Sequence, residues 1–108
     1  MSMNRFMRIL VMFDLPVGSK RERREAVRFR NYLLNEGYVM MQFSVYYRIC
    51  SGYDMVKKYE HKLERHLPNQ GSVRMVCMTE KQFSSMKLLV GDDLENEKKV
   101  NSSSLSIF

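Results

Sequence analysis

Apolar and polar residues alternate first with the period of a strand and then with the period of a helix. Residues 5–14 are apolar and β-branched, which predicts a central strand, and Pro16 ends it because proline cannot donate to a sheet ladder. After a turn, Ser19 and Glu22 have the spacing of a capping box, in which two side chains satisfy free amides at a helix start. We therefore expect a strand followed by a helix over residues 20–36.

A second strand region comes after this helix, once Gly37 supplies a left-handed stop. Residues 38–50 are rich in tyrosine, valine and methionine, as strands are, but they outnumber the roughly five to six residues of a mean strand. We expect either two strands or one sharply bent strand, with the break between residues 42 and 44.

The next segment predicts a second helix. Ser51 and Asp54 repeat the capping spacing, and Pro68 ends the helical pattern. Apolar residues recur at helical spacing between them and form the expected core stripe, namely Val56, Tyr59, Leu63 and Leu67.

Strand alternation returns over residues 72–79, where Arg74 lies opposite the apolar positions. The capping spacing of residues 79–82 predicts one short helical turn, and residues 87–90 predict a last short strand. The order β-α-β-β-α-β, followed by this short fifth strand, is the ferredoxin-like α+β arrangement, an antiparallel sheet with both helices on one face. This fold alone specifies no function.

Composition then divides the chain into a basic domain and an acidic tail. We expect a ferredoxin-like domain over residues 1–91 and a flexible or partner-contacting tail over residues 92–108, which is rich in serine, asparagine and acids. The 108 residues include 18 Lys or Arg and 12 Asp or Glu, for a net charge of +6. Residues 1–90 hold 16 of the basic and 8 of the acidic side chains, so the excess belongs to the domain.

Several classes of protein are excluded by the same composition. The longest apolar run, residues 9–13, is far shorter than the ~20 residues of a membrane span, and the start of the chain lacks a signal-peptide cleavage site. Cys50 and Cys77 lie in apolar stretches and are typical of small buried side chains in a reducing compartment, not of a disulfide framework or a zinc site. We expect a cytoplasmic protein without membrane contact.

Asp14 is the first candidate for chemistry, because a carboxylate directly after an apolar strand needs a hydrogen bond, a charge partner or a metal. Capping of the following turn and metal binding are both open on this reasoning. Mg²⁺ retains several waters and often uses only one or two protein carboxylates. A symmetric dimer would bring two copies of Asp14 to one axis, where the ion could activate water for phosphodiester hydrolysis.

A cluster of basic residues on the first helix is the second candidate. Arginine's fork fits phosphate better than lysine's point charge, so we favour contact with a nucleic-acid backbone over a merely solvated helix surface. The cluster consists of Lys20, Arg21, Arg23, Arg24, Arg28 and Arg30. Arg21, Arg24 and Arg28 are spaced to share one face. Further basic residues that could extend the path are Arg48, Lys57, Lys58, Lys62 and Arg74.

Ser44 is an auxiliary candidate, because it lies where the long strand must bend. Its hydroxyl could orient a phosphate or a water. The competing interpretation is a serine that hydrogen-bonds the backbone at a bulge, which is the commoner role.

Several features together resemble the small CRISPR-associated adaptation protein, the second family of that numbered series. They are residues 8–16, the arginine-rich first helix that ends in Gly37, the segment Gln42-Phe43-Ser44-Val45-Tyr46, and residues 71–75 followed by Thr79-Glu80-Lys81-Gln82-Phe83. The resemblance covers about residues 5 to 91.

This resemblance implies a ferredoxin-like homodimer whose last strand crosses to the partner subunit. It implies magnesium or manganese bound at the dimer axis by the acid that matches Asp14. The family is described as a metal-dependent nuclease on single-stranded RNA or double-stranded DNA, and as the bridge between dimers of the integrase that inserts new spacers. In the second role, basic residues that match Lys20, Arg21, Arg23 and Arg24 contact the duplex backbone.

The residues and the resemblance together support three functional hypotheses. The leading one is a dimeric scaffold of CRISPR adaptation that binds double-stranded DNA and retains a candidate metal-dependent phosphodiesterase site at Asp14. The second is a working magnesium-dependent endoribonuclease or DNase in which scaffolding is secondary. The third is a generic RNA-binding ferredoxin-like module.

Overall fold

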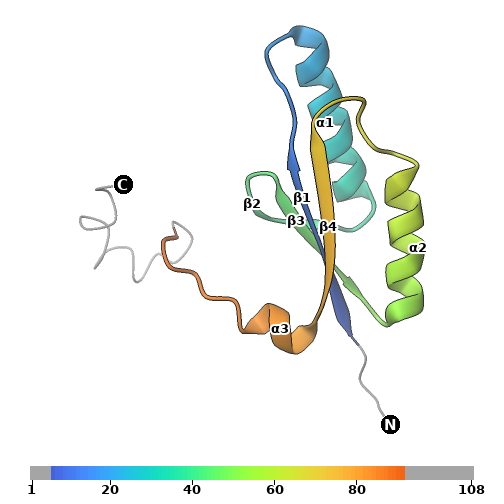
Figure 1. The fold of residues 1–108 in the computed structure, drawn as a ribbon, viewed down its shortest axis with the longest axis vertical. Helices are drawn as coiled ribbons and strands as arrows, with labels where there is room; N and C mark the ends of the chain where they lie inside the picture. The colour runs from blue at the N-terminus through green and yellow to red at the C-terminus, as the bar shows by residue number, and fades with distance from the viewer. Residues whose placement is uncertain (1–5, 92–108) are drawn as a thin grey trace.

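A computed structural model describes residues 6–91, which form one antiparallel sheet with three helices (Figure 1). The elements in chain order are β1 (Met7–Asp14), α1 (Lys20–Asn35), β2 (Val39–Gln42), β3 (Val45–Cys50), α2 (Tyr53–Glu64), β4 (Ser72–Thr79) and α3 (Glu80–Ser84). The strands lie in the order β2-β3-β1-β4, so β1 is paired on both sides. The predicted ferredoxin-like α+β class is confirmed.

The core lies between the sheet and the helices α1 and α2. Ile9 and Val11 of β1 are fully buried there, together with Phe29 of α1 and Val56 of α2. Because alternate residues of a strand point to opposite faces, the residues of β1 at even positions face away from these helices. We call that side of the sheet the outer face. The short helix α3 packs on it.

Local signals at the helix ends hold as predicted. The Ser19 hydroxyl accepts from the Glu22 amide at 3.1 Å, and the Glu22 carboxylate accepts from the Ser19 amide at 2.9 Å. Gly37 has φ +93°, the left-handed geometry that ends α1. The stretch from 38 to 50 is two strands with a tight turn at residues 43 and 44.

Two predicted boundaries are wrong. Helix α2 has Gly52 as its N-cap without a side-chain hydrogen bond, and it ends at Glu64, three residues before Leu67. Leu67 is therefore 44% exposed and is no part of the core stripe. The backbone of residues 65–71 leads the chain into β4, which removes the last position of the expected apolar spacing from the helix.

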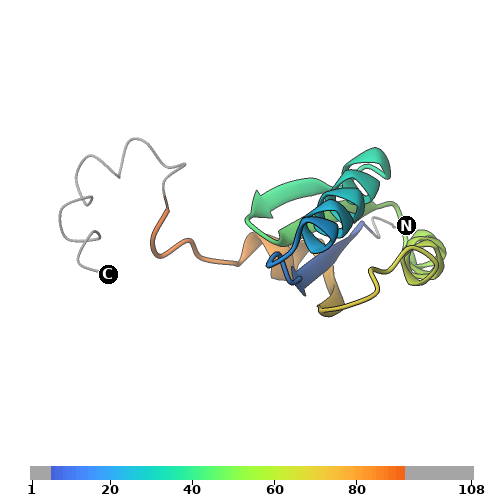
Figure 2. The same cartoon turned by 90° about the horizontal axis from the view of Figure 1, so that it is seen from above.

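No fifth strand forms at residues 87–90 within the described part of the chain. A strand needs a neighbour for its hydrogen bonds, and this segment runs away from the sheet in two perpendicular views (Figure 1, Figure 2). Leu89 is 82% exposed there. The tail predicted over residues 92–108 lies outside the described residues. None of the described helices is long and apolar enough to cross a membrane.

Candidate nucleic-acid interface and the Asp14 edge

Asp14 is the last residue of β1 and lies opposite Ser72 of β4. Its side chain is exposed and makes no hydrogen bond or ion pair with residues 6–91. Within these residues it does not cap the following turn, and metal binding at Asp14 stays a prediction. No group of three or more His, Cys, Asp or Glu side chains that could hold a metal ion exists among the residues that the structure describes.

Two backbone features fix the end of β1 that carries Asp14. Ser44 has φ 65°, and its carbonyl accepts from the Phe13 amide at 3.0 Å, which ties the β2–β3 turn to the end of β1. Gly71 has φ +92°, and a Cβ added there would lie 2.5 Å from the Asp14 carbonyl oxygen. The end of β1 therefore contacts the residues that directly precede both of its neighbouring strands, β3 and β4.

Of the two roles expected for the Ser44 side chain, only the backbone hydrogen bond at a bulge can be checked against these contacts, and it is not formed within the described residues. Its hydroxyl makes no hydrogen bond with residues 6–91, and the register irregularity of the hairpin lies between Met40 and Gln42. It is the Ser44 carbonyl that bonds Phe13. Whether the exposed hydroxyl contacts a phosphate stays a prediction.

The solvent side of α1 carries a shallow basic hollow. Lys20, Arg23 and Arg24 line it with uncharged neighbours and with Arg28, and no acidic residue contributes to its lining. The Arg23 guanidinium donates to the Val17 carbonyl at 3.0 Å, which holds it at the start of the helix. Lys20, Arg23 and Arg24 form no ion pair within residues 6–91, unlike Arg28, and we call these three residues the basic hollow.

Arg21 and Arg28 differ from the basic hollow in their partners. Arg21 lines a separate hollow together with Glu22 and Glu25. Arg28 forms an ion pair with Glu25 at 3.0 Å, and this contact lowers the Glu25 pKa. Arg24 and Arg28 of the predicted stripe thus line one hollow and Arg21 lines the other, and of the three only Arg28 forms an ion pair within the described residues.

Arg48 belongs to the packing of the domain and not to the predicted extension of the nucleic-acid path. Its guanidinium donates to the Glu36 carbonyl at 2.8 Å and to the Tyr59 hydroxyl at 2.7 Å, and it stacks on the Tyr59 ring at 3.7 Å. Lys62 is paired with the Glu36 carboxylate at 2.7 Å. Of the five predicted extension residues, Lys57, Lys58 and Arg74 remain exposed.

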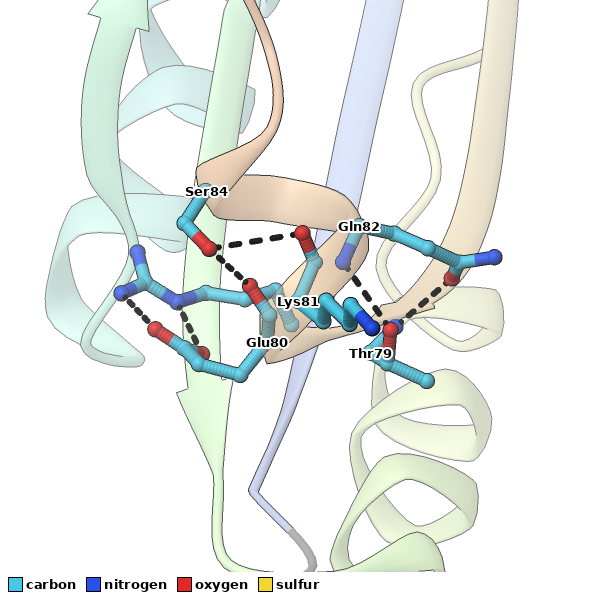
Figure 3. Close-up of polar contacts among 6 residues, drawn as sticks. Thr79, Glu80, Lys81, Gln82 and Ser84 are labelled. Atoms are coloured by element: carbon cyan, nitrogen blue, oxygen red, sulfur yellow. Dashed lines mark hydrogen bonds and ion pairs between the residues drawn. The ribbon is translucent and has the colours of Figure 1, made fainter.

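Sequence reasoning missed an ion pair at the other end of β1. The Arg8 guanidinium donates to both carboxylate oxygens of Glu80, at 2.9 and 2.6 Å (Figure 3). It lies 4.0 Å from the centre of the Phe83 ring. This hydrogen bonding raises the Arg8 pKa and lowers the Glu80 pKa. The partners are 72 residues apart in sequence, so no local spacing could have revealed them.

The fold, the exposed carboxylate at the end of the central strand and the basic hollow together define a small basic ferredoxin-like protein with one open sheet face. Residues 7–86 match the family model described as CRISPR associated protein Cas2. The chain belongs to this family, as the sequence motifs indicated.

Curated relatives agree with the family model over most of the chain. A protein of Acidovorax ebreus is 56% identical over 94% of this chain and 100% of its own length. A protein of Campylobacter jejuni is 47% identical over 97% of this chain and 73% of its own. One from Ligilactobacillus salivarius is 40% identical over 82% and 88%. All three are named CRISPR-associated endoribonuclease Cas2.

Proposed function

We propose that this chain is a homodimeric scaffold of CRISPR spacer acquisition that binds double-stranded DNA through α1 and bridges dimers of the integrase. The observation that carries the DNA-binding part is the basic hollow, whose lining holds Lys20, Arg23 and Arg24 and no acid. Side chains of this kind neutralise phosphates without reading bases. Arg21 and Arg28 are secondary contacts in this proposal, because Glu22 and Glu25 lie beside them.

The outer face of the sheet supports the homodimer. Antiparallel sheets with one solvated face usually carry polar residues there, but this face is largely apolar. Strand pairing and alternation assign to it Leu10, Met12, Val45, Tyr47, Ile49, Val76 and Met78. Its exposed charges at one end, Asp14 and Arg74, are opposite in sign and not paired with each other. A second copy related by a two-fold axis would match both properties.

Magnesium, or manganese in its place, fits Asp14 best as an ion shared by two copies. No group of three or more potential ligands exists in the described chain, so each copy would contribute its exposed Asp14 carboxylate, and two copies together would supply the one or two carboxylates that Mg²⁺ commonly uses. When bound, such an ion lowers the pKa of a coordinated water and stabilises phosphoryl charge. In this proposal each Asp14 holds and orients the ion from the fixed end of β1.

A second candidate function is hydrolysis of RNA at the same edge. The three relatives are called endoribonucleases, and Asp14 is the exposed carboxylate that such a reaction would require. The two functions differ in which residues they need. Scaffolding needs the basic hollow, whereas hydrolysis needs the charge of Asp14.

The DNA-binding proposal is tested by the salt dependence of duplex binding. Replacing both Arg23 and Arg24 by alanine should reduce the magnitude of the slope of log K against log salt by about 2. Each phosphate contact releases about 0.9 counterion from the DNA, and a variant that lacks the contact leaves that counterion bound. Lys57→Ala with Lys58→Ala removes the same charge from the exposed side of α2 and is the matched control. Equal slopes for both double variants would contradict the proposal.

Asp14→Asn separates the two candidates. The substitution keeps the shape of the side chain but removes the charge that a divalent ion needs. We expect magnesium-dependent cleavage of single-stranded RNA to disappear while duplex binding and spacer integration persist. If integration also fails, Asp14 serves more than hydrolysis; if cleavage survives, Asp14 is not the metal ligand.

A further inference from the structure

Helix α3 occupies one end of the outer face. Arg8 and Tyr47 have the strand positions that point away from α1 and α2, and both contact Phe83 of α3. The Tyr47 and Phe83 ring centres are 5.1 Å apart, and the Arg8 guanidinium lies 5.0 Å from the Tyr47 ring. This end of the face is thus already covered by the chain's own residues.

The position of α3 is fixed by several independent contacts. Glu80 of α3 forms a bidentate ion pair with Arg8 of β1, and the Arg8 side chain is only 14% exposed. Thr79 and Gln82 form a reciprocal capping box with contacts of 2.9 and 3.0 Å, and the Ser84 hydroxyl donates to the Glu80 carbonyl at 2.8 Å (Figure 3). Such contacts leave a five-residue helix little freedom to move.

Asp14 lies at the opposite end of the same face. Along β1 the outward residues are Arg8, Leu10, Met12 and Asp14, so α3 and the candidate metal ligand are separated by the length of one strand. Between them the outward residues of β1 are apolar and Val76 of β4 is 39% exposed, while Arg74 of β4 lies opposite Met12, near the Asp14 end. A second copy that packs on this face can therefore cover the Asp14 end but meets α3 at the Arg8 end.

We propose that α3 is a register stop for the homodimer, and that Arg8, Glu80 and Phe83 are positioning residues for the paired Asp14 carboxylates. The idea rests on the proposed homodimer and adds what sets its geometry. An apolar sheet face specifies sliding position only weakly, because apolar contacts are not directional. A rigid helix at one end limits how far the two copies can slide, and this limit brings the two carboxylates to the axis.

The test measures the approach of the two Asp14 positions directly. In full-length Asp14→Cys protein, a short bismaleimide should link the two chains rapidly, and the protein with native Asp14 gives the background from Cys50 and Cys77. Adding Glu80→Gln, which keeps the shape but removes the charge, should slow this linking several-fold. Glu64→Gln, an exposed charge on α2, is the matched control and should leave the rate unchanged. Sedimentation at the same concentration reports the fraction of dimer.

The outcomes distinguish the two proposals. If the protein is a monomer, or if the dimer with α3 intact is not linked, the proposed pairing of Asp14 fails. If linking is rapid and Glu80→Gln links as fast as Glu64→Gln, pairing stands and the register stop is overturned. Phe83→Ala is a second route to the same result, because it removes the ring under Arg8 and leaves both charges. A variant with normal dimer content but slow linking supports the register stop.

Discussion

The two ends of β1 carry opposite charges in opposite situations. Arg8, near the start of the strand, is 14% exposed and donates two hydrogen bonds to Glu80. Asp14, at the end of the strand, is exposed and has no polar side-chain contact with residues 6–91. Both lie on the outer face, so the difference does not come from the side of the sheet.

The difference separates a structural charge from a candidate functional one. A charge that is paired within its own chain is costly to separate from its partner and offers little to a ligand. An exposed charge that the backbone holds in place, but no side chain neutralises, is available to a metal ion or a second copy. The same distinction divides α1, where Arg28 is paired and the basic hollow is not.

Gly71→Ala should break the Asp14 end with the largest effect on stability. At φ +92° a side chain is strained, and its Cβ would lie 2.5 Å from the Asp14 carbonyl oxygen and 2.8 Å from the Leu15 side chain. We expect a loss of about 3 kcal/mol in the free energy of unfolding, measured with urea. Gly37→Ala is the control, because its φ is nearly equal but its nearest neighbour is the Arg48 side chain at 3.3 Å. A larger loss at Gly37 would contradict this account.

Phe83→Ala should weaken the Arg8 end by a smaller amount. The ring packs against Arg8 and Tyr47, and its loss leaves the ion pair to Glu80 without its apolar cover. We expect about 1 to 2 kcal/mol less stability in urea unfolding. If stability does not change, α3 does not depend on the contacts of this ring with Arg8 and Tyr47.

Acidification should weaken the Arg8 end, where the charge is paired. Arg8 lowers the pKa of Glu80 below its ordinary 4.5, so the contact stabilises the folded state above that value. The contribution is lost as the pH falls through the lower value of the folded protein. An NMR titration of the Glu80 carboxyl and the Arg8 Nε–H should show one shared midpoint below 4.5. Separate midpoints would show that the pair does not titrate as a unit.

Asp14→Asn should have the smallest effect on folding. No side-chain contact within residues 6–91 is removed, so the free energy of unfolding should change by no more than about 0.5 kcal/mol. A loss well above this value, seen with circular dichroism during urea unfolding, would show that Asp14 has a structural role. The two ends of β1 would then differ less than their contacts indicate.

Short-range signals allowed most of the fold to be predicted. The capping pairs at Ser19 and Thr79 act over three residues, and Gly37 acts through its own backbone, so each is decided locally. The sequence also identified Asp14 as a candidate, because an acidic residue that directly follows an apolar strand is unusual. These are the features in which one segment alone determines the outcome.

Features that depend on distant partners could not be predicted. Residues 87–90 have strand-like composition but no neighbouring strand in the described chain. The sequence pattern favoured Arg48 as an exposed cation, but its guanidinium donates to the Glu36 carbonyl after α1 and to the Tyr59 hydroxyl of α2. Periodicity predicts which face a residue takes, but it does not identify the side chains that meet it there.

The position of β1 in the sheet also has a consequence for biosynthesis. This strand is made before its two neighbours, β3 and β4, and β4 begins only at Ser72. Until then the nascent chain exposes one edge of an apolar strand, and Arg8 lacks its ion-pair partner, because Glu80 follows β4 in the chain. The sheet can therefore close only after β4 has been made, and products truncated before Ser72 should be prone to aggregate through β1.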